Sequence, residues 1–326
     1  MKSIWIALLG IAVLAGSASG ASTGTSVDFV AYSTPKDAYG KIISAFQKTG
    51  AGKGVGFSQS YNASFDQARA VAAGQPADIV ALSLAPDIDY LVKKNLVPKN
   101  WAANSHRGVA SDSVVVFVVR DGNPKHITGW ADLVKKGIEV ITPNPFTSGG
   151  ARWNVMAAYG AQRRGGKSDK QGVKYLYKLF HHVPVQPASA REALTIFAQG
   201  KGDVLLTYEN EAIYANKKGV HTDYHVPKAT LLIETPAALT KSGLKKPAAK
   251  AFYKYLWSAS AQRAFADQGY RPVLKNVAKR YHFFKPPGLF TINSKQYGLN
   301  GWTKVQRRFF NPQHGIMAAI ERSLGH

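Results

Sequence analysis

Short apolar segments that alternate with longer helical segments are the feature of this 326-residue chain that most constrains its fold. Each segment is short enough for one strand, and apolar residues recur at helical spacing in the stretches between them. This alternation is typical of α/β proteins with parallel sheets. The length suggests two domains at about 150 residues each. The predicted strands cover residues 27–32, 55–59, 77–82, 139–142 and 202–207.

Two further apolar segments, residues 113–120 and 230–235, are long enough to run from one domain into another. We therefore expect two crossover strands that bracket an inserted middle domain. The predicted first lobe comprises residues 26–115 and 237–326, and the predicted second lobe comprises residues 116–236. At the end of the chain, residues 302–324 have helical spacing of apolar residues, which predicts one closing helix.

The N-terminus has the order of a secretory signal peptide. Lys2 precedes an apolar run at residues 4–14, and small residues follow at 16–20. A membrane anchor is the alternative, but the run is roughly a dozen residues where a spanning helix needs ~20. We predict a signal peptide over residues 1–20, cleavage after Gly20, a periplasmic location and no membrane span afterwards. The chain has no cysteine, which excludes disulfides, thiolate metal sites and a lipoprotein anchor.

The charge balance is strongly basic, with 42 Lys and Arg against 19 Asp and Glu and a net charge of +23. Such a charge indicates nucleic acid, anionic membranes or anionic ligands as partners. The basic residues are dispersed, however, and form no stripe with interleaved aromatic residues. Export also argues against nucleic acid, so we expect no nucleic-acid partner. A separate hypothesis is that a carboxylate-poor surface suits an acidic exterior.

Four predicted helix starts share a chemistry that suits an anion. Three resemble capping boxes, at residues 34–37, 64–67 and 189–192. The fourth follows the strand that ends at Thr142, where a turn over residues 143–150 ends in Ser-Gly-Gly. Helix starts leave N–H groups unpaired at the positive end of the helix dipole. Each cap also has an ordinary structural explanation, but in open α/β sheets such starts can meet in one cleft.

Catalytic and metal-binding patterns are weak in this sequence. Residues 165–168 resemble the end of a P-loop, but Ala161 stands where that motif needs glycine. His181 and His182 are adjacent, so they do not face one metal centre. There is no nucleophile elbow and no recognisable acid/base pair of carboxylates. We therefore predict that the protein is not an enzyme and has no metal or cofactor.

The sequence Asn-Pro-Phe-Thr-Ser-Gly-Gly-Ala-Arg-Trp-Asn at residues 144–154 closely resembles the signature of periplasmic sulfate- and thiosulfate-binding proteins, the receptors of ABC importers. The resemblance implies a two-lobed periplasmic binding protein of type II, with a mixed, mostly parallel sheet flanked by helices in each lobe. It also implies a monomer that binds sulfate or thiosulfate and delivers it to a permease with its ATPase. Other segments that agree in order are 59–64, 77–80, 120–124, 202–212, 270–272, 289–292 and 301–304.

The resemblance also implies a site. In this family neutral donors hold the ionised oxyanion: mostly backbone N–H groups at helix starts, one serine hydroxyl and one indole N–H. Two arginines, Arg152 and Arg191, are expected to support the site by pairing with a carboxylate such as Glu209 or Glu211. The implied ligand contacts are the Ser64 hydroxyl, the side chain of Tyr208, and backbone groups of Ser33, Ser148, Gly149, Gly150 and Ala190.

Three departures from the family pattern leave the ligand open. Ser33 stands in place of the usual aspartate, Phe146 in place of a polar residue, and Tyr208 in place of the indole donor. A phenol both donates and accepts hydrogen bonds, which lowers the penalty on a protonated ligand. The alternatives are therefore a receptor for phosphate or molybdate, an exported enzyme that acts on an anionic ester, and a basic adhesion protein.

Overall fold

The computed structural model describes residues 25–325, and the predicted signal peptide lies outside them. Nine strands form one continuous hydrogen-bonded arrangement in the order β2-β1-β3-β8-β4-β6-β5, with β7 paired to β4 and β9 paired to β8. The strands are β1 (Ser26–Tyr32), β2 (Gly56–Asn62), β3 (Ile79–Ala81), β4 (Val109–Arg120), β5 (Val140–Ile141), β6 (Val204–Tyr208), β7 (Thr222–His225), β8 (Ala229–Leu239) and β9 (Gly288–Phe290).

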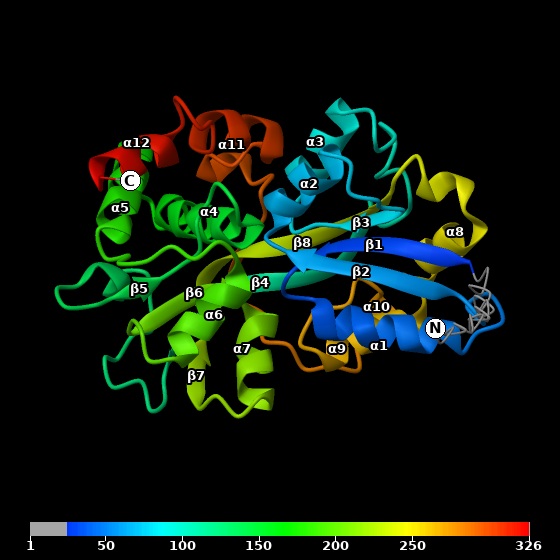
Figure 1. Ribbon diagram of the computed structural model, residues 1–326. Coiled ribbons are helices and arrows are strands. Elements are labelled where there is room, and N and C mark those ends of the chain that lie inside the picture. The colour runs from blue at the N-terminus through cyan, green and yellow to red at the C-terminus, as the bar shows by residue number, and fades with distance from the viewer. Residues whose placement is uncertain (1–24, 326) are drawn as a thin grey trace, which may run out of the picture.

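Helices cover the sheet on both sides (Figure 1). The α-helices are α1 (Lys36–Gln47), α2 (Ser64–Ala72), α3 (Ala85–Lys93), α4 (Gly149–Arg164), α5 (Asp169–Phe180), α6 (Ala190–Ala198), α7 (Glu209–Lys217), α8 (Pro247–Tyr255), α9 (Ala259–Asp267), α10 (Lys275–Ala278), α11 (Gly301–Phe309) and α12 (Ile316–Ser323). Short 3-10 helices are η1 (Asp132–Val134), η2 (Gly243–Lys245) and η3 (Lys295–Tyr297).

The strand pairing confirms the predicted mixed α/β fold. All five strands predicted from the alternating segments are present, as β1, β2, β3, β5 and β6. β1 runs parallel to β2 and β3, and β5 runs parallel to β6. The two longer segments form β4 and β8, which pair antiparallel in the middle of the sheet. Figure 1 shows these two long strands running from one lobe to the other.

Each end of the sheet has its own apolar core. In the first lobe, Phe29 of β1 packs with Ile42 of α1 and Phe252 of α8. In the second lobe, Leu206 of β6 packs with Met156 of α4 and with residues of α5. The chain passes between the two lobes through β4 and β8, which contribute residues to both ends of the sheet.

The predicted single closing helix is wrong. The chain forms α11 and α12 instead, separated by a turn that contains Pro312, because proline cannot continue a helix. Phe309 and Ile320 from these helices are buried in the same core as Trp153 of α4. The predicted lobe limits stay a prediction, and this packing favours placing the last segment with the second lobe. Within residues 25–325 no helix is both long and apolar enough to cross a membrane.

Asp112 in the crossover strand β4 makes stability depend on pH. Burial, and then the negative charge of Glu234 opposite it in β8, raise the pKa of Asp112 to about 7. From about pH 4 to pH 7 the folded state therefore keeps a proton that the unfolded chain releases, so stability falls as pH rises. We expect Asp112→Asn to increase the free energy of unfolding by about 2 kcal/mol at pH 8 and to have little effect near pH 4.

Urea unfolding at both pH values measures this difference. Asp121→Asn, in the exposed turn directly after the same strand, is the matched control and is expected to show no such gain. An equal effect of Asp112→Asn at both pH values would contradict the assignment.

Candidate functional site

The start of α4 presents two unpaired N–H groups at the boundary between the lobes. The hydroxyl of Ser148 caps the helix by accepting from the Ala151 N–H at 3.4 Å. In the part of the chain that the structure describes, the N–H groups of Gly149 and Gly150 have no acceptor. A Cβ atom on Gly149 would lie 2.3 Å from Ser83 Oγ, so any side chain here would clash with the first lobe in this arrangement. The backbone is therefore bare where the helix dipole is positive.

The start of α6 lies beside the start of α4. The predicted cap is present, since the Ser189 hydroxyl accepts from the Glu192 N–H at 3.2 Å. Ala190, the first residue of α6, is buried. A Cβ atom on Gly150 would lie 3.1 Å from Ala190 Cβ. Two helix N-termini of the second lobe therefore meet at one place.

Tyr208, at the end of β6, lies at the same place. A Cβ atom on Gly150 would come within 2.9 Å of its ring. Its hydroxyl is 2.7 Å from the hydroxyl of Ser83, which follows β3 in the first lobe. Burial raises the pKa of Tyr208 well above its ordinary value, so the phenol stays protonated. The residue therefore supplies a neutral O–H group between the lobes.

Two of the predicted capping boxes are wrong. α2 begins at Ser64 itself, and its hydroxyl donates to Asp87 Oδ2 at 2.6 Å while accepting from the Ser83 N–H at 2.9 Å. Thr34 does not cap α1, because its hydroxyl pairs with that of Tyr270 at 3.0 Å. The Ser64 hydroxyl has one proton, and in this structure that proton points to Asp87. It can serve an anion only after it turns away from Asp87.

Ser33 directly follows β1 and is half-buried. It lies next to Thr34, whose carbonyl accepts from the guanidinium of Arg191 in α6 at 2.8 Å. This bond joins the first lobe to the second. The chain segment that carries Ser33 is thereby held against the start of α6.

The two predicted arginines are both neutralised by carboxylates. Arg191 makes two bonds of 2.8 Å to Glu211. Arg152 pairs with Asp87 at 3.3 Å rather than with Glu209 or Glu211. Burial raises the pKa of Asp87, and the Arg152 charge and the Ser64 hydroxyl oppose that rise. Neither arginine is therefore left without a carboxylate partner, and the unpaired N–H groups at the start of α4 are neutral.

Direct hydrogen bonds hold the lobes together around these groups. The Phe65 N–H of α2 donates to the Thr147 carbonyl at 3.1 Å. The Trp153 indole of α4 donates to the Ser83 carbonyl, also at 3.1 Å. The Ser83–Tyr208 and Arg152–Asp87 contacts also join the two lobes directly. The lobes are therefore closed against each other in this structure.

Sequence reasoning missed Ser83, Asp87 and Trp153. A signal existed for Ser83, because it comes directly after the predicted strand at residues 77–82, and ligands bind at the carboxyl ends of strands. Asp87 and Trp153 lie inside helices, and nothing in their spacing distinguishes them from ordinary helix residues. Their role depends on which elements the fold brings together.

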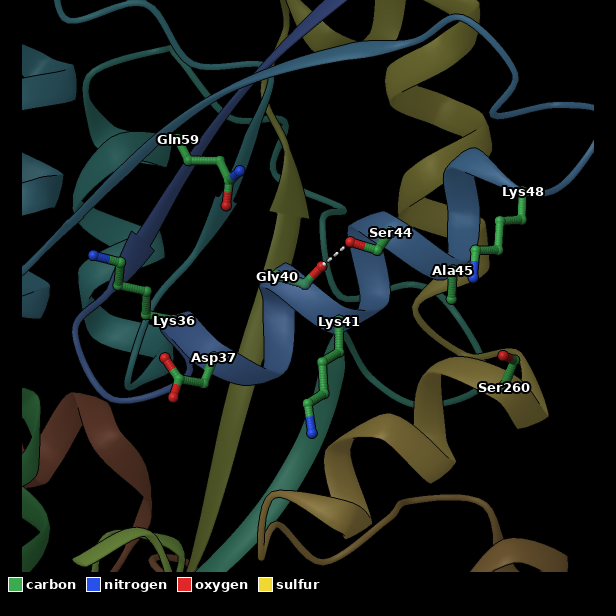
Figure 2. Close-up of a pocket in the computed structure, with 9 residues that line it drawn as sticks. All are labelled: Lys36, Asp37, Gly40, Lys41, Ser44, Ala45, Lys48, Gln59 and Ser260. Carbon is green, nitrogen blue, oxygen red and sulfur yellow. Dashed lines mark hydrogen bonds between the residues drawn. The ribbon is translucent and has the colours of Figure 1, made fainter. Parts of the chain in front are cut away.

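The P-loop-like segment and the histidine pair, which could have indicated other functions, make ordinary structural contacts. Ser168, in the P-loop-like segment, caps α5 in a capping box with Gln171. His182 lies 2.9 Å from the Ile138 carbonyl, and within the described range no group of three His, Asp or Glu side chains could hold a metal. A surface hollow along α1 contains Lys36, Lys41 and Lys48, whose ammonium groups do not converge (Figure 2). It contains none of the predicted site residues.

Comparisons with known proteins identify the family and the fold of this chain. Residues 27–271 match the family described as bacterial extracellular solute-binding proteins. The sulfate-binding protein of Synechococcus elongatus is 37% identical and aligns over 90% of this chain and 86% of its own length. The thiosulfate-binding protein of Pseudomonas aeruginosa is 34% identical over 86% of this chain and 88% of its own.

A solved structure, the sulfate-binding protein SubI from Mycobacterium tuberculosis, is 42% identical. It covers 88% of this chain and 100% of its own, with a TM-score of 0.84. This match extends across both lobes and through the crossover strands. The chain therefore belongs to the bacterial extracellular solute-binding proteins, in the group that contains the sulfate- and thiosulfate-binding proteins.

Proposed function

We propose that the protein is a periplasmic receptor that binds sulfate or thiosulfate between its lobes and delivers it to an ABC importer, composed of a permease and its ATPase. The names of its relatives and the resemblance of residues 144–154 support this ligand. Hinge bending at β4 and β8 closes the lobes on the anion. The receptor binds stoichiometrically and catalyses no reaction.

The observation that carries the proposal is the meeting of neutral donors at the boundary between the lobes. The unpaired N–H groups of Gly149 and Gly150 lie beside the start of α6 and the ring of Tyr208, whose hydroxyl is 2.7 Å from that of Ser83 in the first lobe. Hydrogen bonds to an ionised acceptor are strong, and fixed dipoles replace the water that a buried dianion loses. Sulfate needs only donors. The net charge of +23 also favours its approach.

Calorimetry on protein that has been denatured, dialysed free of anion and refolded tests the proposal. Sulfate, thiosulfate, phosphate and molybdate are titrated separately. We expect one-to-one binding of sulfate or thiosulfate. No binding of either would contradict the proposed function, and turnover of an anionic ester would support an enzyme instead.

Tyr208→Phe is expected to weaken sulfate binding about 10-fold to 100-fold. The variant removes one hydroxyl and leaves the ring, and hydrogen bonds to charged groups contribute roughly 1.5–3 kcal/mol. Tyr177→Phe in α5, at a half-buried position outside the site, is the matched control. Equal affinities for the two variants would remove Tyr208 from the proposed site.

A further inference from the structure

Ser83 lies at the centre of the polar contacts between the lobes, although it matches no predicted ligand position. It is completely buried. Its N–H donates to Ser64 Oγ at 2.9 Å, its carbonyl accepts from the Trp153 indole at 3.1 Å, and its hydroxyl is 2.7 Å from that of Tyr208. The Ser83 hydroxyl is thus placed by contacts on its own backbone, and Tyr208 is its side-chain partner.

The two hydroxyls together offer more than a donor. They carry two protons, and their mutual hydrogen bond uses one of them. Either oxygen can be the donor in that bond. The pair therefore keeps one O–H that can donate to a ligand and lone pairs that can accept from one. A backbone N–H or an indole N–H, by contrast, only donates.

The pair also lies directly against the donors of α4. A Cβ atom on Gly149 would lie 2.3 Å from Ser83 Oγ and 2.5 Å from Ser83 Cβ. A Cβ atom on Gly150 would lie 2.9 Å from the Tyr208 ring. An anion that binds the free N–H groups of Gly149 and Gly150 is therefore next to both hydroxyls.

We propose that Ser83 and Tyr208 together contact the bound anion and admit tetrahedral oxyanions that carry one proton, such as hydrogen phosphate, alongside fully ionised ones. This inference rests on the proposed function and extends its ligand class. In a site with donors only, the ligand's own proton has no acceptor, and unpaired polar groups of this kind lower affinity by up to ~10⁴-fold. A lone pair on Ser83 or Tyr208 accepts that proton.

The test compares two ligands that differ mainly by one proton. At about pH 8 phosphate carries one proton and two charges, whereas fluorophosphate carries two charges and no proton. Calorimetric titration gives the ratio of their dissociation constants, with sulfate as the reference ligand. The protein is compared with Ser83→Ala, Tyr208→Phe and the double variant. The double variant removes both hydroxyls, so no buried hydroxyl loses its hydrogen-bond partner. Thermal melts check that each variant is folded.

We expect the wild-type ratio of phosphate to fluorophosphate constants to lie within about 10-fold, and the double variant to raise it at least about 100-fold. Loss of a hydrogen-bond donor weakens the binding of both ligands equally, so it cancels in the ratio of their dissociation constants. If the two hydroxyls only hold the lobes together, the ratio therefore stays unchanged. Ser44→Ala with Tyr177→Phe, both outside the site, is the matched double control.

Three outcomes overturn the inference: an unchanged ratio in the double variant, a wild-type ratio of ~10⁴ or more, or sulfate and fluorophosphate binding with no measurable phosphate binding. A wild-type protein that binds none of the three ligands contradicts the proposed function instead. The two failures are therefore distinguishable in one set of titrations.

Discussion

Gly149→Ala is expected to lower sulfate affinity about 100-fold while leaving the protein folded. The new Cβ atom would lie 2.3 Å from Ser83 Oγ, 2.5 Å from Ser83 Cβ and 2.7 Å from Leu84 Cδ2, all in the first lobe. Overpacking of this kind costs about 1–3 kcal/mol, and 2.7 kcal/mol is about 100-fold in affinity. The clash crosses between the lobes, so a small opening at the hinge relieves it. Because ligand binding requires the lobes to close, the clash lowers the affinity for sulfate rather than the stability of the fold.

Calorimetric titration of sulfate and a thermal melt without ligand measure the two parts of this prediction. Gly40→Ala in α1 is the matched control, because apart from its chain neighbours and the adjacent backbone of its own helix nothing lies within 4 Å of its Cβ position. We expect this control to bind sulfate normally and to gain up to about 1 kcal/mol in stability, since alanine favours helix. Gly149→Ala that binds as tightly as wild type would show that the lobes do not close at this contact.

Seven of the nine strands in residues 25–325 were predictable because they depend on local pattern, whereas the short strands β7 and β9 were not predicted. Residues 27–32 and 77–82 are apolar runs bounded by helical segments, and they form the neighbouring parallel strands β1 and β3. The end of the chain was less predictable. Residues 302–324 keep helical spacing of apolar residues across Pro312, so periodicity alone does not show the break between α11 and α12.

In the candidate site, too, features set by local sequence were predictable and features set by long-range packing were not. The Ser148-Gly149-Gly150 start can be read from the sequence, because its bare N–H groups follow from residue type and helix geometry. The direction of the Ser64 hydroxyl cannot, because it depends on Asp87, which lies 23 residues further along the chain. The contact of Ser83 with Tyr208 spans 125 residues. Such contacts follow from the packing of the lobes and from no local pattern.

Arg191→Ala is expected to lower the free energy of unfolding by about 3–5 kcal/mol, because it leaves a buried carboxylate without its partner. The side chain of Glu211 has 0% exposure and Arg191 has 22%. Two bonds of 2.8 Å join them, and a third bond of 2.8 Å joins Arg191 to the Thr34 carbonyl of the first lobe. Removing the Arg191 side chain therefore destabilises the second lobe and also removes one of its hydrogen bonds to the first.

The pH dependence of this loss identifies its cause. Burial raises the pKa of Glu211, and Arg191 opposes that rise, so the variant has a still higher Glu211 pKa. The folded variant then keeps a proton that the unfolded chain releases, and its stability falls as pH rises from about 5 to 8. Urea unfolding at these two pH values is the measurement. Arg191→Ala with Glu211→Gln removes the buried charge and is expected to recover part of the stability and to lose the additional pH dependence.

Arg69→Ala is the matched control for this experiment. Arg69 pairs with Asp66 on α2, and its side chain is 54% exposed, so its removal costs less than about 1 kcal/mol. A comparable loss from the two arginine variants would mean that burial of Glu211 is not what makes Arg191 important. A loss from Arg191→Ala that is equal at both pH values would assign its effect to packing and to the Thr34 contact rather than to the charge of Glu211.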